Sequence, residues 1–153
     1  MAIGDTRKHN RIDLIVSGRY DEGRAGGAIS PGALIEKNSS GTYVVQADDG
    51  GIAEGNECIV ASIDALQGKT MDDAYASGDL VPFFIPKAGD VVALRLKDGE
   101  VITTDDYLTS DGTGQVRLAV AAQSPIEGNL FVAMEALDLT SNGTFEFIKA
   151  RKV

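Results

Sequence analysis

Tryptophan is absent from this chain of 153 residues, and cysteine and histidine each occur once. These counts argue against a tetrahedral zinc site, which takes most of its four ligands from Cys and His. The histidine, His9, stands among Arg7, Lys8 and Arg11 and away from any apolar run, which is typical of a solvated side chain and not of a catalytic base. We therefore expect no metal, no cofactor and no enzymatic activity.

The single cysteine excludes a disulfide within the chain. Cys58 lies in a predicted strand without a basic neighbour that would lower the pKa of its thiol, so we expect a buried, unreactive group. A chain of this length buries roughly 70% of its unfolded surface and needs no covalent staple. These features fit folding in a reducing cytoplasm.

Long hydrophobic runs are also missing. The apolar segment at residues 80–86 is far shorter than the roughly 20 residues that a membrane-spanning helix requires. Residues 1–10 lack the apolar stretch and the small-residue cleavage site of a signal peptide. We expect a soluble protein with no membrane partner.

Basic side chains are fewer than acidic ones and are unevenly placed. The chain has 14 Lys and Arg against 23 Asp and Glu, a net charge of −9. Residues 31–148 account for −13, whereas residues 1–30 sum to +1 and residues 149–153 to +3. An acidic body repels phosphate backbones, so we expect no nucleic-acid partner. The basic ends are suited to contact an acidic partner.

Strand signals follow one another closely from residue 31 onward, separated by Gly, Asn, Asp, Ser or Pro. Apolar and polar residues alternate in several of them, as in residues 92–97, which is typical of strands with one solvated face. Asp98-Gly99 and Asn142-Gly143 predict tight hairpin turns. The expected strands are residues 33–37, 42–47, 57–63, 80–85, 90–97, 100–103, 106–109, 115–122, 129–137 and 143–149.

One hairpin pattern occurs twice. Residues 30–45 and 104–118 each contain a turn, a short strand with a leucine, a polar tip and a second strand, and we interpret them as paired walls of one small barrel. Residues 70–77 predict a short helix, with Thr70 as its cap, early acidic residues and Gly78 as its stop. The predicted fold is therefore mainly β, a small β-barrel or compact β-sandwich of short antiparallel strands with one short helix.

Residues 1–30 differ in composition from the rest. Their one apolar run, residues 12–16, is too small for a separate core, which predicts an extended N-terminal arm, disordered or docked on another surface. Residues 31–153 then form a single β-rich domain. The alternative is that Ile12, Leu14 and Val16 form an edge strand that packs on this chain. Both interpretations stay open.

Three motifs invite a functional interpretation that other residues do not support. The aspartate pairs at residues 48–49, 72–73 and 105–106 lack the ligand spacing of an EF-hand, so we place them in turns or at a helix start. A glycine-rich stretch at residues 23–27 lacks the Lys-Ser/Thr of a phosphate-binding loop. A repeated Gly-Asp-x-Val pattern is similar to a turn of lipoyl and biotinyl carrier domains, but residues 134–137 contain no lysine to carry the cofactor.

Three pairs of short segments together resemble the small β-rich head decoration, or cement, proteins of tailed bacteriophages. The segments are Ser-Pro-Gly-Ala-Leu at 30–34 with Gly-Thr-Tyr-Val-Val at 41–45, Ser-Gly-Asp-Leu-Val at 77–81 with Pro-Lys-Ala-Gly-Asp-Val-Val at 86–92, and Val-Ala-Met-Glu-Ala-Leu at 132–137 with Phe-Glu-Phe-Ile at 145–148. The resemblance covers about residues 30–149 and includes no catalytic motif.

This resemblance implies a structural protein of the virion that binds the outer surface of an expanded phage head and stabilises contacts between major capsid subunits. Such proteins are commonly homotrimers, and their N-terminal segment often reaches onto the capsid. The residues expected to make this contact are the cations Arg7, Lys8, Arg11 and Arg19, for acidic capsid patches, and the apolar Ile12, Leu14 and Val16, for adding a strand to a capsid sheet.

Two other functions stay open. A carbohydrate- or receptor-binding β-domain on a virion surface needs exposed aromatic platforms, and the chain has four tyrosines, of which Tyr43 and Tyr107 fall in predicted strands. A small β-barrel hydrolase needs carboxylates that converge across a cleft, whereas Asp105 and Asp111 lie around one hairpin tip.

Overall fold

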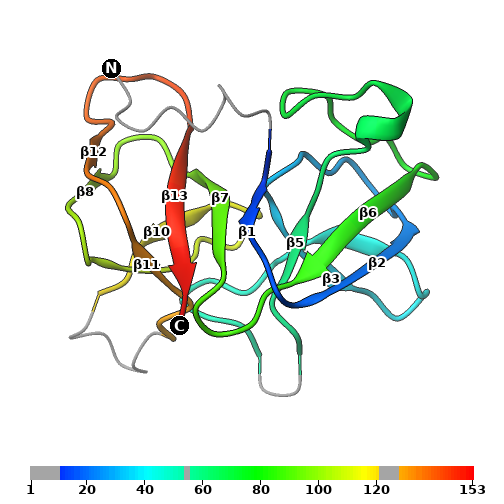
Figure 1. Cartoon of the computed structure of the whole chain (residues 1–153), viewed down its shortest axis with the longest axis horizontal. Helices are drawn as coiled ribbons and strands as arrows, with labels where there is room; N and C mark the ends of the chain where they lie inside the picture. Colours follow the sequence, from blue (N-terminus) through cyan, green and yellow to red (C-terminus); the bar gives the residue numbers. More distant parts are fainter. Residues whose placement is uncertain (1–10, 54–55, 121–127) are drawn as a thin grey trace.

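The computed structural model describes residues 11–53, 56–120 and 128–153. These residues form β-strands in two groups that lie side by side (Figure 1), together with a short 3-10 helix, η2 (Ala65–Gln67). No helix in this part of the chain is long and apolar enough to span a membrane. The mainly β class and the small barrel predicted from the sequence are confirmed.

The first group is a closed barrel. Its sheet has the order β1 (Asp13–Ile15), β7 (Val91–Leu96), β10 (Val116–Leu118), β9 (Tyr107–Ser110), β11 (Phe131–Ala133) and β13 (Glu146–Lys152). β13 also pairs with β7, from Glu146 opposite Leu96 to Arg151 opposite Val91, and this pairing closes the last five strands into a ring. β1 pairs with β7 and is not part of this ring of five strands. A separate two-stranded ladder consists of β8 (Val101–Ile102) and β12 (Leu137–Asp138).

The second group is a curled sheet whose two edge strands come together at one point. Its order is β2 (Arg19–Arg24), β6 (Leu80–Ile85), β5 (Ile59–Ala61), β3 (Leu34–Lys37) and β4 (Tyr43–Val45). The two edge strands are joined by one parallel bridge between Ala25 and Tyr43. The Tyr43 ring also lies against Gly23 of β2, where a Cβ would come within 2.3 Å of a ring carbon. Glycine at this position lets the ring close the gap between the edges.

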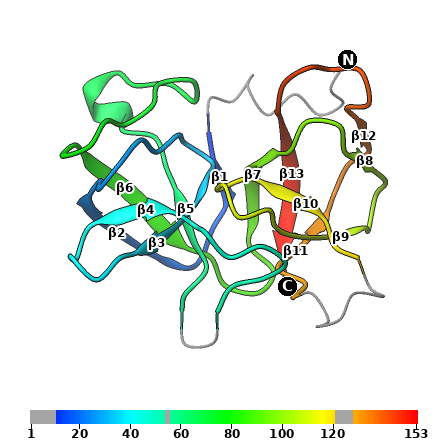
Figure 2. The same cartoon turned by 180° about the vertical axis from the view of Figure 1, so that it is seen from behind.

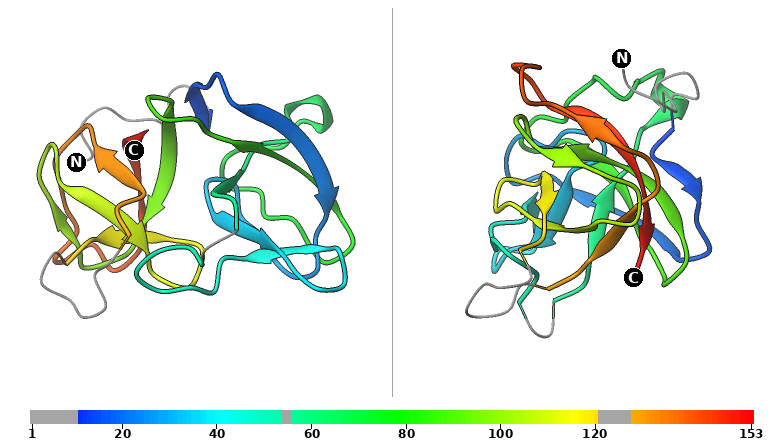
Figure 3. Two further views of the ribbon diagram at one scale, coloured as in Figure 1. Left: turned by 90° about the horizontal axis from the view of Figure 1, so that it is seen from below. Right: turned by 90° about the vertical axis from the view of Figure 1, so that its left-hand side faces the viewer.

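β7 belongs to the barrel and lies on its side toward the second sheet (Figure 3). All six of its residues are buried. Its Leu94 belongs to a core cluster that contains Phe131 of the barrel and Phe84 of the second sheet. A smaller cluster around Ile35 and Phe83 belongs to the second sheet. The larger apolar core therefore continues from the barrel into the second sheet, and it joins the two groups of strands.

Arg95 of β7 adds a polar connection at the same place, where it is only 9% exposed. Its Nε donates a hydrogen bond to the carbonyl of Pro31 at 2.6 Å, and its Nη2 donates to the carbonyl of Met71 at 3.1 Å. The guanidinium carbon lies 4.1 Å from the ring centre of Phe145 and 5.0 Å from that of Phe147. The rings belong to the end of the barrel and the carbonyls to loops of the second sheet, so Arg95 fastens one to the other.

The same four-residue turn precedes four strands. Its fourth residue donates its N–H to the carbonyl of the first, and its third residue has a positive φ and donates its N–H to a carbonyl of a neighbouring segment. The turns are residues 30–33, 76–79, 87–90 and 103–106, and β3, β6, β7 and β9 begin at the next residue. In the last three turns the fourth residue is an aspartate whose carboxylate accepts the N–H of the first residue at 2.8 Å. These acidic residues therefore build turns.

Asp105 occupies the third position of the last turn, where the other three turns have glycine. Its φ is 73°, and no other non-glycine residue of the described chain has a positive φ. Replacing Asp105 by Gly is expected to raise the free energy of unfolding by about 0.5 kcal/mol in urea titrations. The left-handed conformation costs an L-residue roughly 1–2 kcal/mol, and the greater freedom of glycine in the unfolded chain returns part of this gain.

The matched control for this substitution is Asp98→Gly. Asp98 is exposed, and in its turn the next residue, Gly99, already carries the positive φ. The control removes the same charge without relieving backbone strain, so it should not stabilise the protein. A fall in stability for the Asp105 variant would contradict the assigned strain.

The helix predicted at residues 70–77 is wrong. The Asp73 carboxylate accepts the N–H of Thr70 at 2.7 Å and closes a turn, and Tyr75 pairs with Ile29 in an isolated antiparallel bridge. The Tyr75 side chain is 1% exposed. A helix of two turns has little intrinsic stability, so the extended pairing and the burial of Tyr75 decide the local conformation.

The two predicted hairpins are present, but they lie in different sheets (Figure 2). β3 and β4 pair in the second sheet, whereas β9 and β10 pair in the barrel. Their interpretation as walls of one barrel is therefore wrong. The hairpins instead touch each other, since the Leu34 N–H donates to the carbonyl of Gly114 at 2.8 Å. The Gly50 N–H, just after the first hairpin, donates to the carbonyl of Ser110 at 2.8 Å.

The expectation of an N-terminal arm needs correction for residues 11–30. β1 pairs with β7, and β2 pairs with β6 along its whole length. The apolar run at residues 12–16 therefore agrees with the edge-strand alternative, because its apolar side chains find a ready core in this chain. Residues 1–10 of the predicted arm lie outside the described residues.

Candidate interaction surface

The residues predicted to contact a partner divide into three groups. Arg7 and Lys8 lie outside the described residues. Arg11 and Arg19 are exposed, with side chains 58% and 62% accessible. Ile12, Leu14 and Val16 pack on the core of this chain, and the first of them is fully buried. Ile12 therefore faces the protein's own interior, and Leu14 and Val16, which are partly buried, pack against the same core.

The edge-strand alternative placed Ile12, Leu14 and Val16 against this chain, and the structure agrees with that placement. Ile15, between Leu14 and Val16, is 67% exposed. Successive side chains of a strand point to opposite faces, so the residue between two inward ones points to solvent. The exposed apolar residue of β1 is Ile15.

The backbone at the edges of β1 and β2 is partly covered by the protein's own side chains. The Arg11 guanidinium donates to the carbonyl of Asp13 at 3.0 Å, and the Asp21 carboxylate accepts the N–H of Glu22 at 2.8 Å. Charged side chains on an edge strand are a common protection against pairing with foreign strands. These two hydrogen bonds occupy part of the backbone edge that strand addition would use.

Tyr20 of β2 is held in one position on this surface. Its hydroxyl donates to the Asp13 carboxylate at 2.9 Å, and its ring centre lies 5.8 Å from that of buried Phe84. Partial burial and the bond to Asp13 raise the pKa of Tyr20 to about 12, so the phenol stays neutral and remains a donor. The residue is nevertheless 54% exposed, so a rigid aromatic side chain faces solvent.

The buried side chain of Asp90 binds the backbone segments that carry this surface. Its carboxylate accepts hydrogen bonds from the Ser17 hydroxyl at 2.7 Å, the Gly18 N–H at 3.0 Å and the Lys87 N–H at 2.8 Å. Burial alone raises a carboxyl pKa, but here the accepted hydrogen bonds outweigh it and lower the pKa of Asp90. The charged carboxylate therefore ties the bend between β1 and β2 to the turn between β6 and β7.

Five exposed side chains come from β1, β2, β13 and the turn before β7, and we call them the basic corner. They are Ile15, Arg19, Tyr20, Lys87 and Arg151. β7 connects two of them, because its Val91 pairs with Ile15 of β1 on one side and with Arg151 of β13 on the other. Two strand spacings separate these partners, or roughly 10 Å.

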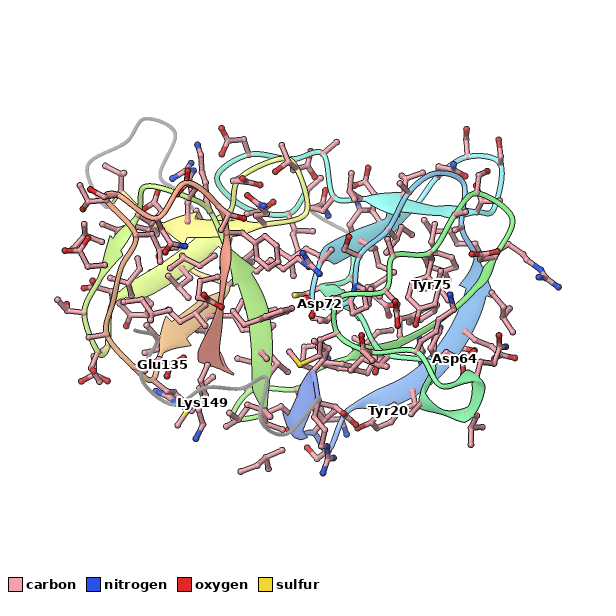
Figure 4. All side chains as sticks on the ribbon, turned by 90° about the horizontal axis from the view of Figure 1, so that it is seen from above. Tyr20, Asp64, Asp72, Tyr75, Glu135 and Lys149 are labelled. Atoms are coloured by element: carbon pink, nitrogen blue, oxygen red, sulfur yellow. The ribbon has the colours of Figure 1, made fainter. Side chains whose placement is uncertain are left out.

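β1, β2 and β13 all lie on the same side of the molecule (Figure 3). Figure 4 shows Tyr20 of β2 and Lys149 of β13 on this side, at the lower edge of the view. Arg151 is two residues from Lys149 along β13 and therefore shares its face. The basic corner thus combines residues from three regions of the sequence on one side of the fold.

Sequence reasoning found only Arg19 of the basic corner. The positive charge of residues 149–153 was a usable signal for Arg151, but nothing in the sequence places it beside β1. Lys87 is brought there by the Gly-Asp turn, whose pattern was visible although the ligands of its aspartate were not.

The other residues considered for catalysis or metal binding have structural roles. The Asp111 carboxylate accepts from the Thr113 N–H at 2.8 Å and the Gln115 N–H at 3.2 Å at its own hairpin tip, and Asp105 lies in a strand-starting turn. Within residues 11–53, 56–120 and 128–153, no group of three or more His, Cys, Asp or Glu is placed to hold a metal ion. Burial raises the pKa of the Cys58 thiol to about 12, which keeps it protonated at neutral pH.

Comparison with known proteins gives a match in fold alone. No family model and no curated protein sequence matches the chain. Among solved structures, the N base of the head fiber protein gp8.5 of bacteriophage phi29 is similar, with a TM-score of 0.55 and 12% sequence identity. The match covers 88% of this chain and 93% of that chain.

Proposed function

We propose that this chain is a structural protein of a bacteriophage head that binds the outer surface of the expanded shell and stabilises contacts between major capsid subunits. The observation that carries the proposal is the similarity of its fold, over 88% of its length, to the base of a phage head fiber protein. The sequence resemblance to head decoration proteins points in the same direction. The proposed partner is the major capsid protein, and the proposed location is the exterior of the virion.

The physical character of the chain supports a structural role. Its barrel is closed by hydrogen-bonded pairing, and its larger core continues into the second sheet. Such an arrangement gives a rigid body that keeps the geometry of a surface patch fixed, which lowers the entropy lost on binding. The acidic composition keeps many copies on one shell soluble and repels free nucleic acid.

We further propose that the protein acts as a homotrimer. Three linked copies convert two of the three contacts into intramolecular events, so modest contacts give lasting attachment. Light scattering is expected to give a mass near three times the 16.1 kDa of one chain. A monomer mass at working concentration would contradict the trimer but leave the head-binding proposal intact.

The test of the function is cosedimentation of the full chain with purified heads of the phage that encodes it. We expect saturable binding to expanded heads and little binding to unexpanded ones, because only the expanded shell presents the final arrangement of subunits. Bound heads should also resist heat or chelators better than bare heads. Absence of binding to either form would overturn the proposal.

A further inference from the structure

We propose that the basic corner is the surface through which this protein docks on an acidic protein surface of the shell. The inference rests on the proposed function and names the chemistry of the contact. Docking takes place through side chains of Ile15, Arg19, Tyr20, Lys87 and Arg151, in place of the strand addition expected for Ile12, Leu14 and Val16.

The first argument is the concentration of positive charge on an acidic protein. The chain has a net charge of −9, yet three of the five side chains in the basic corner are cationic. Lys87 and Arg151 are exposed and have no ion pair within the part of the chain that the structure describes. Two unpaired cations on such a protein favour a partner surface of opposite charge, which also speeds the encounter.

None of the nearby acidic groups forms an ion pair with Lys87 or Arg151 in the part of the chain that the structure describes. Asp90 is buried beneath the corner and accepts three hydrogen bonds. Asp13 accepts from the hydroxyl of Tyr20 and lies 3.7 Å from the guanidinium of Arg11. Glu57 pairs with Arg19 at 3.2 Å. Lys87 and Arg151 are therefore exposed cations that can pair with carboxylates of a partner.

The second argument is the presence of two exposed apolar side chains beside the cations. Ile15 is 67% exposed and Tyr20 is 54% exposed. Protein interfaces are enriched in tyrosine and arginine, and their strongest contacts are apolar or aromatic side chains that become buried. Because Tyr20 is fixed by Asp13 and Phe84, little side-chain entropy is lost when it enters an interface.

The third argument is the rigidity of the backbone that carries the corner. The bend at Ser17 and Gly18 and the turn at Lys87 are bound to the same buried carboxylate, that of Asp90. Arg151 is paired to β7 next to that turn. The backbone positions that carry these side chains are therefore fixed relative to one another, as a docking surface for a regular shell requires.

The experiment compares two double variants that change the net charge equally. The corner variant is Lys87→Glu with Arg151→Glu, and the control is Lys37→Glu with Lys97→Glu. All four side chains are exposed. Lys97 follows the last residue of β7, at the opposite end of this strand from Val91. Lys37 is the last residue of β3, in the second sheet. The readout is the dissociation constant for expanded heads, with thermal melting of each variant to show that both fold.

We expect the corner variant to bind at least about tenfold more weakly and the control to stay within about threefold of the original protein. The affinity of the original protein should also fall as salt rises from 50 to 500 mM, and the corner variant should lose much of this dependence. A third variant, Ile15→Ser, keeps all charges and should weaken binding severalfold.

The outcomes separate the two proposals. If the original protein binds expanded heads and the corner variant binds equally well, the basic corner is not the docking surface, although the head-binding function stands. Equal losses of affinity in the corner and control variants would show that binding depends only on net charge, and this result would also overturn the inference. If the original protein binds no heads at all, the function and the docking surface fall together.

Discussion

Replacing Arg95 by Ala is expected to lower the free energy of unfolding by about 4 kcal/mol. The variant removes the hydrogen bonds that Arg95 donates to the buried carbonyls of Pro31 and Met71, at a cost of about 1–3 kcal/mol each. It also removes a desolvated cation from the rings of Phe145 and Phe147, a contact worth about 2 kcal/mol. Urea unfolding followed by circular dichroism measures the loss, which is a large part of the roughly 5–15 kcal/mol that stabilises a typical domain.

The control for this variant is Arg151→Ala, because Arg151 is exposed on a strand of the same barrel. Exposed substitutions of this kind usually change stability by less than about 0.5 kcal/mol. Arg95→Lys separates charge from geometry, since a lysine keeps the cation but lacks the planar group that reaches two carbonyls and stacks on rings. It should lose at least about 2 kcal/mol. A loss below about 1 kcal/mol for Arg95→Ala would refute the assigned role.

Replacing Asp90 by Asn is expected to cost about 3 kcal/mol at pH 7. The carboxylate accepts hydrogen bonds from Ser17, Gly18 and Lys87, and the amide has one acceptor oxygen in place of two and turns its NH₂ toward a donor. Asp79→Asn is the matched control. Asp79 stands in the same kind of turn, but it is exposed and accepts from Ala76 where water can replace it. The control should lose less than about 1 kcal/mol.

The Asp90 effect should depend on pH in a defined direction. Its pKa in the folded protein lies below that of an unfolded aspartate, which is about 3.9. The group therefore adds stability above pH 4 and loses that contribution as the pH falls through the lowered pKa. The difference in unfolding free energy between the original protein and Asp90→Asn should be full at pH 7 and shrink between about pH 4 and pH 2. A difference that grows on acidification would contradict the lowered pKa.

Most strands were predictable because short-range chemistry specifies them. The turns that precede β6 and β7 contain Gly-Asp, in which glycine takes the positive φ and aspartate binds the first residue of the turn. The strand predicted at residues 80–85 coincides with β6, and that at 90–97 contains β7. The residues of such a turn directly precede those of its strand, so the positions of both can be predicted from a short stretch of sequence.

The features that were missed depend on distant parts of the chain. β2 has the sequence Arg-Tyr-Asp-Glu-Gly-Arg, which carries no apolar alternation, and it forms because all six of its residues pair with β6. The outward position of Ile15 depends on which face of β1 meets the core. Tyr75 is extended because Ile29 offers it a backbone partner. Lys87 and Arg151 are 64 residues apart in sequence, so their shared surface could not be inferred before the fold was known.

The pairing of β13 has a mechanical consequence for the attachment to a phage head that we propose. The strand is paired on both sides, to β7 from Glu146 to Arg151 and to β11 from Ala150 to Lys152. A pull along this strand loads these antiparallel hydrogen bonds in shear, so many must break together, whereas a pull across the strand would open them one after another. The barrel therefore resists tension best along the axis of β13.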